Sequence, residues 1–196
     1  MITYGTNDID ESITVFEPVT IGFPSRNNIG KTKFQGTVIG KSAVLRSGTI
    51  IYCDVSIGNN FNTGHNVLIR ENTRIGNNVS VGTQTIIEGN TNIGNNVSIQ
   101  SMVFIPTNTT IGNDVFIGPN VVITNDKYPP TKNRESLIGA TIMDGAAIGA
   151  NSTILPGVSI GRNALIGAGS VVTKDVPEGM LAVGNPAKIR QKKVII

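Results

Sequence analysis

Aliphatic side chains recur at every sixth position over most of the chain. The longest frame has fifteen positions, and all but one are Ile, Leu or Val: Ile39, Leu45, Ile51, Ile57, Thr63, Ile69, Ile75, Val81, Ile87, Ile93, Ile99, Ile105, Ile111, Ile117 and Ile123. The frame resumes one residue out of step at Ile142, Ile148, Ile154, Ile160, Ile166 and Val172. Neither a helix nor a single long strand produces this period. Each hexad therefore predicts one short strand and a corner, with its anchor pointing into a shared core.

A second period indicates how many hexads make one coil. The run Ile-Gly-Asn-Asn or Ile-Gly-Asn-Asp begins at Ile57, Ile75, Ile93 and Ile111, at every third anchor of the frame. We expect Ile21-Gly22 and Ile39-Gly40 to extend the same series backwards. Because identical corners recur after three hexads, the repeat predicts a three-sided prism whose strands stack at about 4.8 Å. Asn and Gly suit its corners because they tolerate a positive φ.

This pattern resembles that of the hexapeptide-repeat acyltransferase superfamily over roughly residues 13–190. The resemblance implies an all-β fold, a left-handed parallel β-helix, at residues 13–176, with one protruding loop at 124–141. We expect residues 1–12 to cap the first coil, whose strand edges are otherwise open, and residues 177–196 to form a short C-terminal tail. The resemblance also implies a homotrimer with active sites between neighbouring prisms. A passive scaffold or an ice-binding prism is the alternative.

The frame breaks between Thr124 and Thr141, where polar and charged side chains gather. Pro129 and Pro130 keep this segment out of a sheet because they lack a backbone N–H. A loop of this length without secondary structure of its own is usually functional, although a tolerated insertion is the alternative. Repeat regularity is most often abandoned at a functional site, so we expect the active site here.

Two runs at the break resemble the N-acetyltransferases that modify amino groups on nucleotide-linked sugars: Phe116-Ile117-Gly118-Pro119 and Thr124-Asn125-Asp126-Lys127-Tyr128-Pro129. The resemblance places Asn125 at the reaction centre, and we expect Lys127 and Tyr128 to contact the substrate. Sugar-hydroxyl acetyltransferases of the superfamily typically have a histidine base in this loop, and this loop has none. A sugar amine is a nucleophile once it sheds one proton, which Asp126 can accept. The sequence therefore favours N-acetylation over O-acetylation.

His65 is the only histidine of the chain. The γ-class carbonic anhydrases share the fold but bind zinc through three histidines, so we expect no metal. His65 follows Thr63, the one polar anchor, and a broken local rule often marks a site. His65 is either a second general base or sugar contact that faces the Asn125 loop of a neighbouring subunit, or a corner residue bonded to Glu71 or to backbone. Arg70 and Glu71 either contact a sugar diphosphate or are solvated.

The segment after the break is rich in small residues, which would leave a smooth trough for a pantetheine arm. The runs 171–177 and 184–188 match the usual ending of the superfamily, and the resemblance implies acetyl-CoA as the acyl donor. The implied coenzyme contacts are Gly149, Ala150, Ala168 and Thr173 along the arm, and Lys174, Lys188 and Arg190 at the phosphates. The alternative is that the small residues only suit corners and that the basic tail is solvated. A backbone N–H near Gly145 or Ala146 is a candidate oxyanion donor.

Composition narrows the picture further. The formal net charge is +3, which suits an anionic small ligand but is too weak and scattered to indicate nucleic acid. The single cysteine, Cys53, cannot form an intramolecular disulfide, and no apolar run is long enough for a membrane span. With no signal pattern at the N-terminus, we expect a cytoplasmic enzyme. O-acetylation, a non-sugar amine acceptor and a non-enzymatic scaffold are the rival functions.

Overall fold

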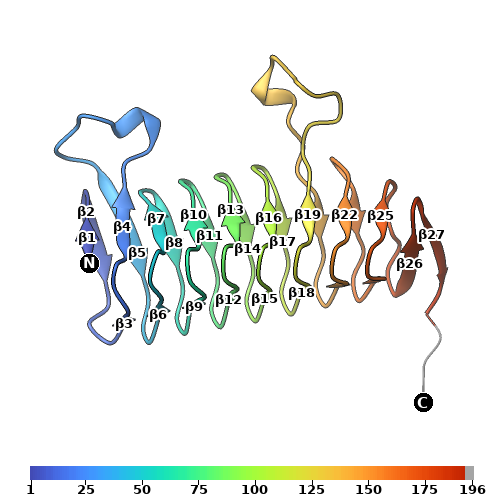
Figure 1. The fold of residues 1–196 in the computed structure, drawn as a ribbon, viewed down its shortest axis with the longest axis horizontal. Helices are drawn as coiled ribbons and strands as arrows, with labels where there is room; N and C mark the ends of the chain where they lie inside the picture. The colour runs from blue at the N-terminus through green and yellow to red at the C-terminus, as the bar shows by residue number, and fades with distance from the viewer. Residues whose placement is uncertain (193–196) are drawn as a thin grey trace.

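The computed structural model describes residues 1–192, which fold into a three-sided parallel β-helix. Figure 1 shows its coils stacked along one long axis, with the N-terminus at one end and the last strands at the other. Sheet A is the nine-stranded face, sheet B the eight-stranded face and sheet C the ten-stranded face. In each coil the chain passes from sheet A to sheet B to sheet C and then back to sheet A. We name the three corners between these sheets edge AB, edge BC and edge CA.

Most strands are only two residues long. Sheet A contains β1 (Ile2–Thr3), β4 (Thr20–Phe23), β7 (Ile50–Tyr52), β10 (Leu68–Ile69), β13 (Ile86–Ile87), β16 (Phe104–Ile105), β19 (Val122–Ile123), β22 (Thr153–Ile154) and β25 (Val171–Val172). Sheet B contains β2 (Thr6–Ile9), β5 (Gln35–Ile39), β8 (Val55–Ile57), β11 (Arg74–Ile75), β14 (Asn92–Ile93), β17 (Thr110–Ile111), β20 (Thr141–Ile142) and β23 (Ser159–Ile160). Sheet C contains β3 (Thr14–Val15), β6 (Val44–Leu45), β9 (Asn62–Thr63), β12 (Ser80–Val81), β15 (Ser98–Ile99), β18 (Phe116–Ile117), β21 (Ala147–Ile148), β24 (Leu165–Ile166), β26 (Met180–Gly184) and β27 (Ala187–Gln191). Two 3₁₀ helices, η1 (Arg26–Asn28) and η2 (Arg134–Ser136), lie outside the sheets.

The three-hexad period sets the register of the stacked coils. Ile57 pairs with Ile75, and Ile75 pairs with Ile93, so identical positions lie above one another. The anchors are buried; Ile69 and Ile87, for example, are 0% exposed. Full burial of such a side chain contributes about 1.5–3 kcal/mol. The fold confirms the predicted all-β hexapeptide prism and is consistent with its left hand.

The corners also follow the prediction. Asn60, Asn78 and Asn96 have φ values of 58°, 56° and 57°. The residue before each of them stacks as well, since Asn59 N–H donates to Asn77 Oδ1 and Asn77 N–H donates to Asn95 Oδ1, both at 2.8 Å. These amide ladders satisfy backbone donors that the tight turn leaves without a strand partner.

The prediction of a single protruding loop is wrong, because Figure 1 shows two. Loop 1 (residues 24–34) joins β4 to β5, and loop 2 (residues 124–140) joins β19 to β20. Ile21 pairs with Ile51 in sheet A, whereas Ile39 pairs with Ile57 in sheet B. The expected backward extension of the corner series to Ile21 is therefore wrong.

The length of the insertion explains why the hexad pattern of the sequence does not reveal loop 1. Ile51 and Ile57 are one hexad apart, whereas Ile21 and Ile39, at the same two faces, are three hexads apart. Loop 1 therefore adds two whole hexads, and the frame looks unbroken across them. Ile123 and Ile142 are three hexads and one further residue apart, so loop 2 shifts the frame by one position.

Both ends of the chain take part in the sheets. Strands β1 and β2 lie within residues 1–12, where we expect a cap, and pair in parallel with β4 and β5. At the other end, β26 pairs in parallel with β24, and β27 pairs antiparallel with β26. Residues 193–196 of the expected tail lie outside the described residues. No helix within residues 1–192 has the length and apolarity needed to cross a bilayer.

Candidate functional site

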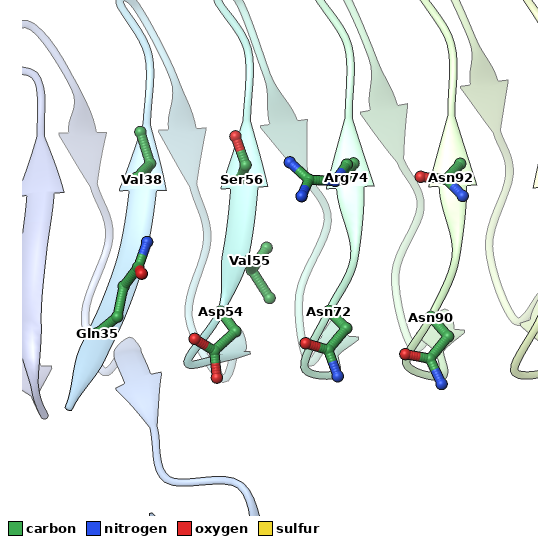
Figure 2. A pocket seen from close by; sticks show the side chains of 9 residues that line it. All are labelled: Gln35, Val38, Asp54, Val55, Ser56, Asn72, Arg74, Asn90 and Asn92. Atoms are coloured by element: carbon green, nitrogen blue, oxygen red, sulfur yellow. The ribbon is translucent and has the colours of Figure 1, made fainter.

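Both loops leave the prism from edge AB, and the corners between them line three hollows. The hollow beside loop 2 has a volume of about 450 Å³, and the hollow beside loop 1 has a volume of about 370 Å³. A third, of about 550 Å³, lies on the sheet B side, where Figure 2 shows Asp54, Asn72 and Asn90 in a row on successive coils. Asn72 lines all three hollows. Together they form one trough along edge AB.

The base of loop 2 is fixed to the coil before it. Asn125 Nδ2 donates to the Thr107 carbonyl at 3.2 Å, and the Asn125 carbonyl accepts the Ile138 N–H at 2.9 Å. Asn108 Nδ2 donates to the Leu137 carbonyl at 2.8 Å. Within residues 1–192, Asn125 Oδ1 has no hydrogen-bond partner. The predicted reaction-centre residue therefore has a fixed position and a free acceptor atom.

The ladder opens beside Asn125. Strands β16 and β19 share only the pair Phe104 and Val122. The following hydrogen bond of the ladder would come from the N–H of residue 106, which is proline and has no N–H to donate. In the coil before, the equivalent N–H, that of Glu88, donates to the Ile105 carbonyl at 2.8 Å. The sequence therefore removes a ladder hydrogen bond at the point where loop 2 begins.

Asp126 organises the start of loop 2. Its two carboxylate oxygens accept the N–H groups of Tyr128, at 3.1 Å, and Thr131, at 2.9 Å. Tyr128 is 80% exposed, and the Lys127 ammonium lies 5.7 Å from the centre of its ring. Neither Lys127 nor Tyr128 lines the trough described above. Their predicted substrate contact is a prediction that this single chain does not test.

Arg70 lies in the trough but is fully engaged by neighbouring side chains. Its Nε and one terminal nitrogen donate to the two oxygens of Glu71 at 3.0 and 2.9 Å, and the other nitrogen lies 3.4 Å from Glu88. The guanidinium also stacks 5.0 Å from the ring centre of Tyr52. The hydrogen bonds to Glu71 raise the pKa of Arg70. Arg70 and Glu71 thus form a closed pair rather than two free contacts.

His65 lies on edge CA, away from the Asn125 loop of its own chain. Its Nδ1 is 2.8 Å from Ser47 Oγ, and its backbone N–H donates to Thr83 Oγ1 at 3.1 Å. The expected alternative of a hydrogen bond to Glu71 is wrong, because Glu71 lies on edge AB and bonds Arg70. Ser47, one coil before, therefore holds the imidazole, and Thr83, one coil after, holds the backbone of His65.

Thr63 has a structural reason to be polar. Its Oγ1 accepts the Arg46 N–H at 2.9 Å and contacts Thr49 Oγ1 at 3.1 Å, while its carbonyl accepts from the Arg46 guanidinium at 2.5 Å. The sheet pairing between β6 and β9 is reduced to Val44 and Asn62 at this place. The hydroxyl replaces a lost ladder bond, so the polar anchor does not by itself mark a site.

The expected coenzyme residues divide between two edges and the last strand. Gly149, Ala150 and Ala168 share edge CA, and their backbones approach so closely that a Cβ on Gly149 would lie 2.5 Å from Ala168 N. Thr173 and Lys174 follow β25 and therefore lie on edge AB. Lys188 and Arg190 lie on β27, and both are exposed. The structure brings together only the small residues of edge CA.

Comparison with known proteins agrees with the repeat. The family model described as bacterial transferase hexapeptide (six repeats) matches residues 72–107, 90–125 and 139–174. The chain belongs to the hexapeptide-repeat superfamily. One solved structure, the UDP-N-acetylglucosamine acyltransferase of Francisella novicida, aligns with a TM-score of 0.66 over 96% of this chain and 68% of that chain, at 20% identity. That likeness shows the fold alone.

Two curated relatives match shorter stretches of the chain. One is a dTDP-3-amino-3,6-dideoxy-α-D-galactopyranose 3-N-acetyltransferase of Aneurinibacillus thermoaerophilus, 46% identical over 56 residues, or 29% of each chain. The other is a 2,3,4,5-tetrahydropyridine-2,6-dicarboxylate N-acetyltransferase of Clostridium botulinum, 51% identical over 73 residues, or 37% of this chain and 29% of the relative. The match thus spans less than a third of either relative's length.

Sequence reasoning missed loop 1 and the trough between the loops. The signal was present, because the hexad positions between Ile21 and Ile39 are Asn27 and Lys33, both polar. Glu88 also escaped notice, although it follows Arg70 by three hexads, which is one full coil, and must therefore stack on it. In a hexapeptide-repeat chain, corner residues are best sought along such columns rather than along the sequence.

Proposed function

We propose that this chain is an acetyl-CoA-dependent N-acetyltransferase whose acceptor is the amino group of a nucleotide-linked sugar. The observation that carries the proposal is Asn125, fixed at the base of loop 2 with Oδ1 free, in a loop without histidine. An amide oxygen can accept a hydrogen bond from an amine and so orient its lone pair. The relative named as a dTDP-amino-sugar N-acetyltransferase supports the same acceptor.

The proposed reaction is a direct attack. Asn125 positions the amine, whose nitrogen forms a bond to the thioester carbonyl carbon while the carbon–sulfur bond breaks. The amine proton passes to Asp126 or His65, and the coenzyme leaves as a thiolate that takes up a proton. A backbone N–H stabilises the oxyanion. The expected donors Gly145 and Ala146 are wrong, because they lie on edge BC and their N–H groups donate to the carbonyls of Asn113, at 2.9 Å, and Met143, at 3.3 Å. No metal takes part in this scheme.

A homotrimer is part of the proposal, and the outer face of sheet A supports it. The side chains that precede the anchors there are apolar on five successive coils: Ile50, Leu68, Ile86, Phe104 and Val122. The same positions of sheet B are mostly polar, as at Ser56, Arg74 and Asn92. Ile50 and Val122 are exposed and the other three are half-buried, and an apolar face of this kind on one side of the prism indicates an interface.

Sheet A is bounded by edges AB and CA, so a closed ring of three prisms would bring edge AB of one protomer towards edge CA of the next. The position of each residue along the prism axis then decides which residues of neighbouring protomers come close. Gly149 and Ala150 lie about one coil, or about 5 Å, beyond the height of Asn125, whereas His65 lies about three coils, or about 14 Å, before it. This arrangement favours edge CA as the coenzyme site and Asp126 over His65 as the base. Lys188 and Arg190 would meet coenzyme phosphates near that end, and Thr173 and Lys174 would lie one edge away.

The test is thiol release from acetyl-CoA with UDP- and dTDP-linked 3-amino and 4-amino sugars and matched hydroxyl sugars. Wild type should turn over an amino sugar, and Asn125→Ala should lower kcat by about a hundredfold or more. Asn78→Ala, a change of an exposed corner asparagine on edge BC, is the control. Turnover of hydroxyl sugars alone would contradict the proposal and assign the base role to His65.

A non-sugar amine is the second candidate acceptor, favoured by the relative named for a tetrahydropyridine dicarboxylate. Small amines without a nucleotide belong in the same panel for this reason. A cytoplasmic location stays a prediction.

A further inference from the structure

Arginines other than Arg70 line the trough, and they are not paired with acidic side chains as Arg70 is. Arg70 is neutralised by Glu71 and Glu88, so it offers little to an anionic ligand. Arg134 lines the hollow beside loop 2, and Arg26 lines the hollow beside loop 1. Within residues 1–192, neither of these two guanidinium groups forms an ion pair. Arg74, on β11, lines the hollow on the sheet B side and forms no ion pair within the described residues either. Each loop therefore supplies one of the three free arginines of the trough.

The floor between the loops is polar and evenly spaced. Asn72, Asn90 and Asn108 occupy the same corner position on successive coils, with φ values of 59°, 55° and 67°. Two coils separate Asn108 from Asn72, which is about 10 Å. Amide side chains at this spacing can bond the hydroxyls of an elongated polar ligand. The hollows on the two sides of Asn72 extend the floor to both loops.

We propose that the trough along edge AB binds the diphosphate and nucleoside of the acceptor. Arg134 binds the diphosphate, and Arg26 supplies a second positive charge from the opposite loop. This inference rests on the proposed function and assigns its anion-binding residues. The guanidinium fork fits phosphate oxygens in a bidentate way. The reacting sugar lies towards Asn125, next to Asn108, and the nucleoside lies towards Asn72 and loop 1. Arg70 shapes the floor and does not touch the phosphates.

The first experiment measures binding without any acyl donor. Calorimetry with UDP and dTDP, and with uridine and thymidine as phosphate-free probes, is done on wild type, Arg134→Gln and Arg26→Gln. Loss of one charge-assisted hydrogen-bond partner should weaken diphosphate binding by about ten- to hundredfold at Arg134 and by a smaller factor at Arg26. Nucleoside binding should change little, so the preference for the diphosphate over the nucleoside should shrink.

Arg162→Gln is the matched control, because it removes the same charge from edge BC, where Arg162 lies 3.8 Å from Asp144. Equal binding of UDP and dTDP by Arg134→Gln and wild type would overturn the inference. So would an equal loss in Arg162→Gln, which would indicate net charge alone, or an equal loss for nucleoside and diphosphate. No measurable binding of either diphosphate by wild type would overturn it too.

The two proposals fail separately. Acetyl transfer to an amino sugar together with unaltered diphosphate binding in Arg134→Gln would leave the function standing and remove the anion site. Diphosphate binding through Arg134 without acetyl transfer to any amine would keep the anion site and remove the function.

Discussion

Replacement of Thr63 by valine tests whether the polar anchor is structural. The two side chains have nearly the same shape, but valine removes the hydroxyl that accepts the Arg46 N–H at 2.9 Å and contacts Thr49 Oγ1 at 3.1 Å. Thr63 is 1% exposed, so water cannot replace the lost partner without a local opening. Thr49 keeps its other hydrogen bond, to the Arg46 carbonyl at 2.6 Å. The variant therefore isolates one unsatisfied backbone donor.

The magnitude follows from two opposing terms. An unsatisfied buried N–H costs about 1–3 kcal/mol. Exchange of the hydroxyl for a buried methyl group returns about 0.8 kcal/mol. We expect Thr63→Val to lower the free energy of unfolding by about 0.2–2.2 kcal/mol, with about 1 kcal/mol in the middle of that range, although all fourteen other anchors of the frame are aliphatic. A rule based on hydrophobic pattern alone predicts the opposite sign.

Urea denaturation at equal m-values measures the change, and acetyl transfer measured on the same preparations tests the site. Thr63→Ser keeps the hydroxyl and serves as the control for the lost methyl. Both variants should keep wild-type kcat/KM. A Thr63→Val protein as stable as wild type would refute the ladder argument. Lost turnover at unchanged stability would instead place Thr63 in the functional site.

Three further predictions concern a strand glycine, a turn and the proposed base. Gly22→Ala should destabilise the first coil far more than Gly30→Ala in urea denaturation, because both have positive φ but only a Cβ on Gly22 would overlap a backbone carbonyl oxygen, that of Tyr4; equal effects would contradict this. Hydrogen bonds from Ser12 lower the pKa of Asp10 below 3.8, so the stability that they contribute is present above that value and lost as pH falls; Ser12→Ala should raise the pKa in a carboxyl NMR titration. Asp126→Asn should lower kcat by about a hundredfold or more, with a near-normal Tm, if Asp126 takes the proton; a kcat within a few fold of wild type would exclude that role.

The strands were predictable because one physical constraint repeats in every coil. Each anchor must enter the core, so Ile75 and Ile93 are recognisable from spacing alone. The placement of Ile21 was not, because loop 1 adds two whole hexads and keeps the frame. The polar residues at Asn27 and Lys33 were the available correction. Pattern analysis detects an insertion that shifts a frame more readily than one that preserves it.

The site was less predictable because its contacts run between coils. Arg70 was singled out from its own hexad, as a residue that replaces the usual glycine, and a diphosphate contact was one expectation. Its neighbours in space are Tyr52 and Glu88, which stand three hexads before and three hexads after it. A comparison of residues that are one full coil apart would have identified both neighbours. The bidentate pairing with Glu71 depends on side-chain direction, which the period does not specify.

The position of both loops on edge AB has a physical consequence for the site. Each coil contacts mainly its neighbours, so an insertion at a corner leaves the ladders of the other coils intact and costs only local loop closure. Strands β19 and β20 accordingly keep their sheet pairings on either side of loop 2. The prism can therefore hold two loops at a fixed separation of about five coils, or about 24 Å, without help from either loop. A trough whose length is set by a rigid ladder selects ligands by length as well as by charge. This is why we propose an extended nucleotide-linked acceptor, and not a compact amine, for edge AB.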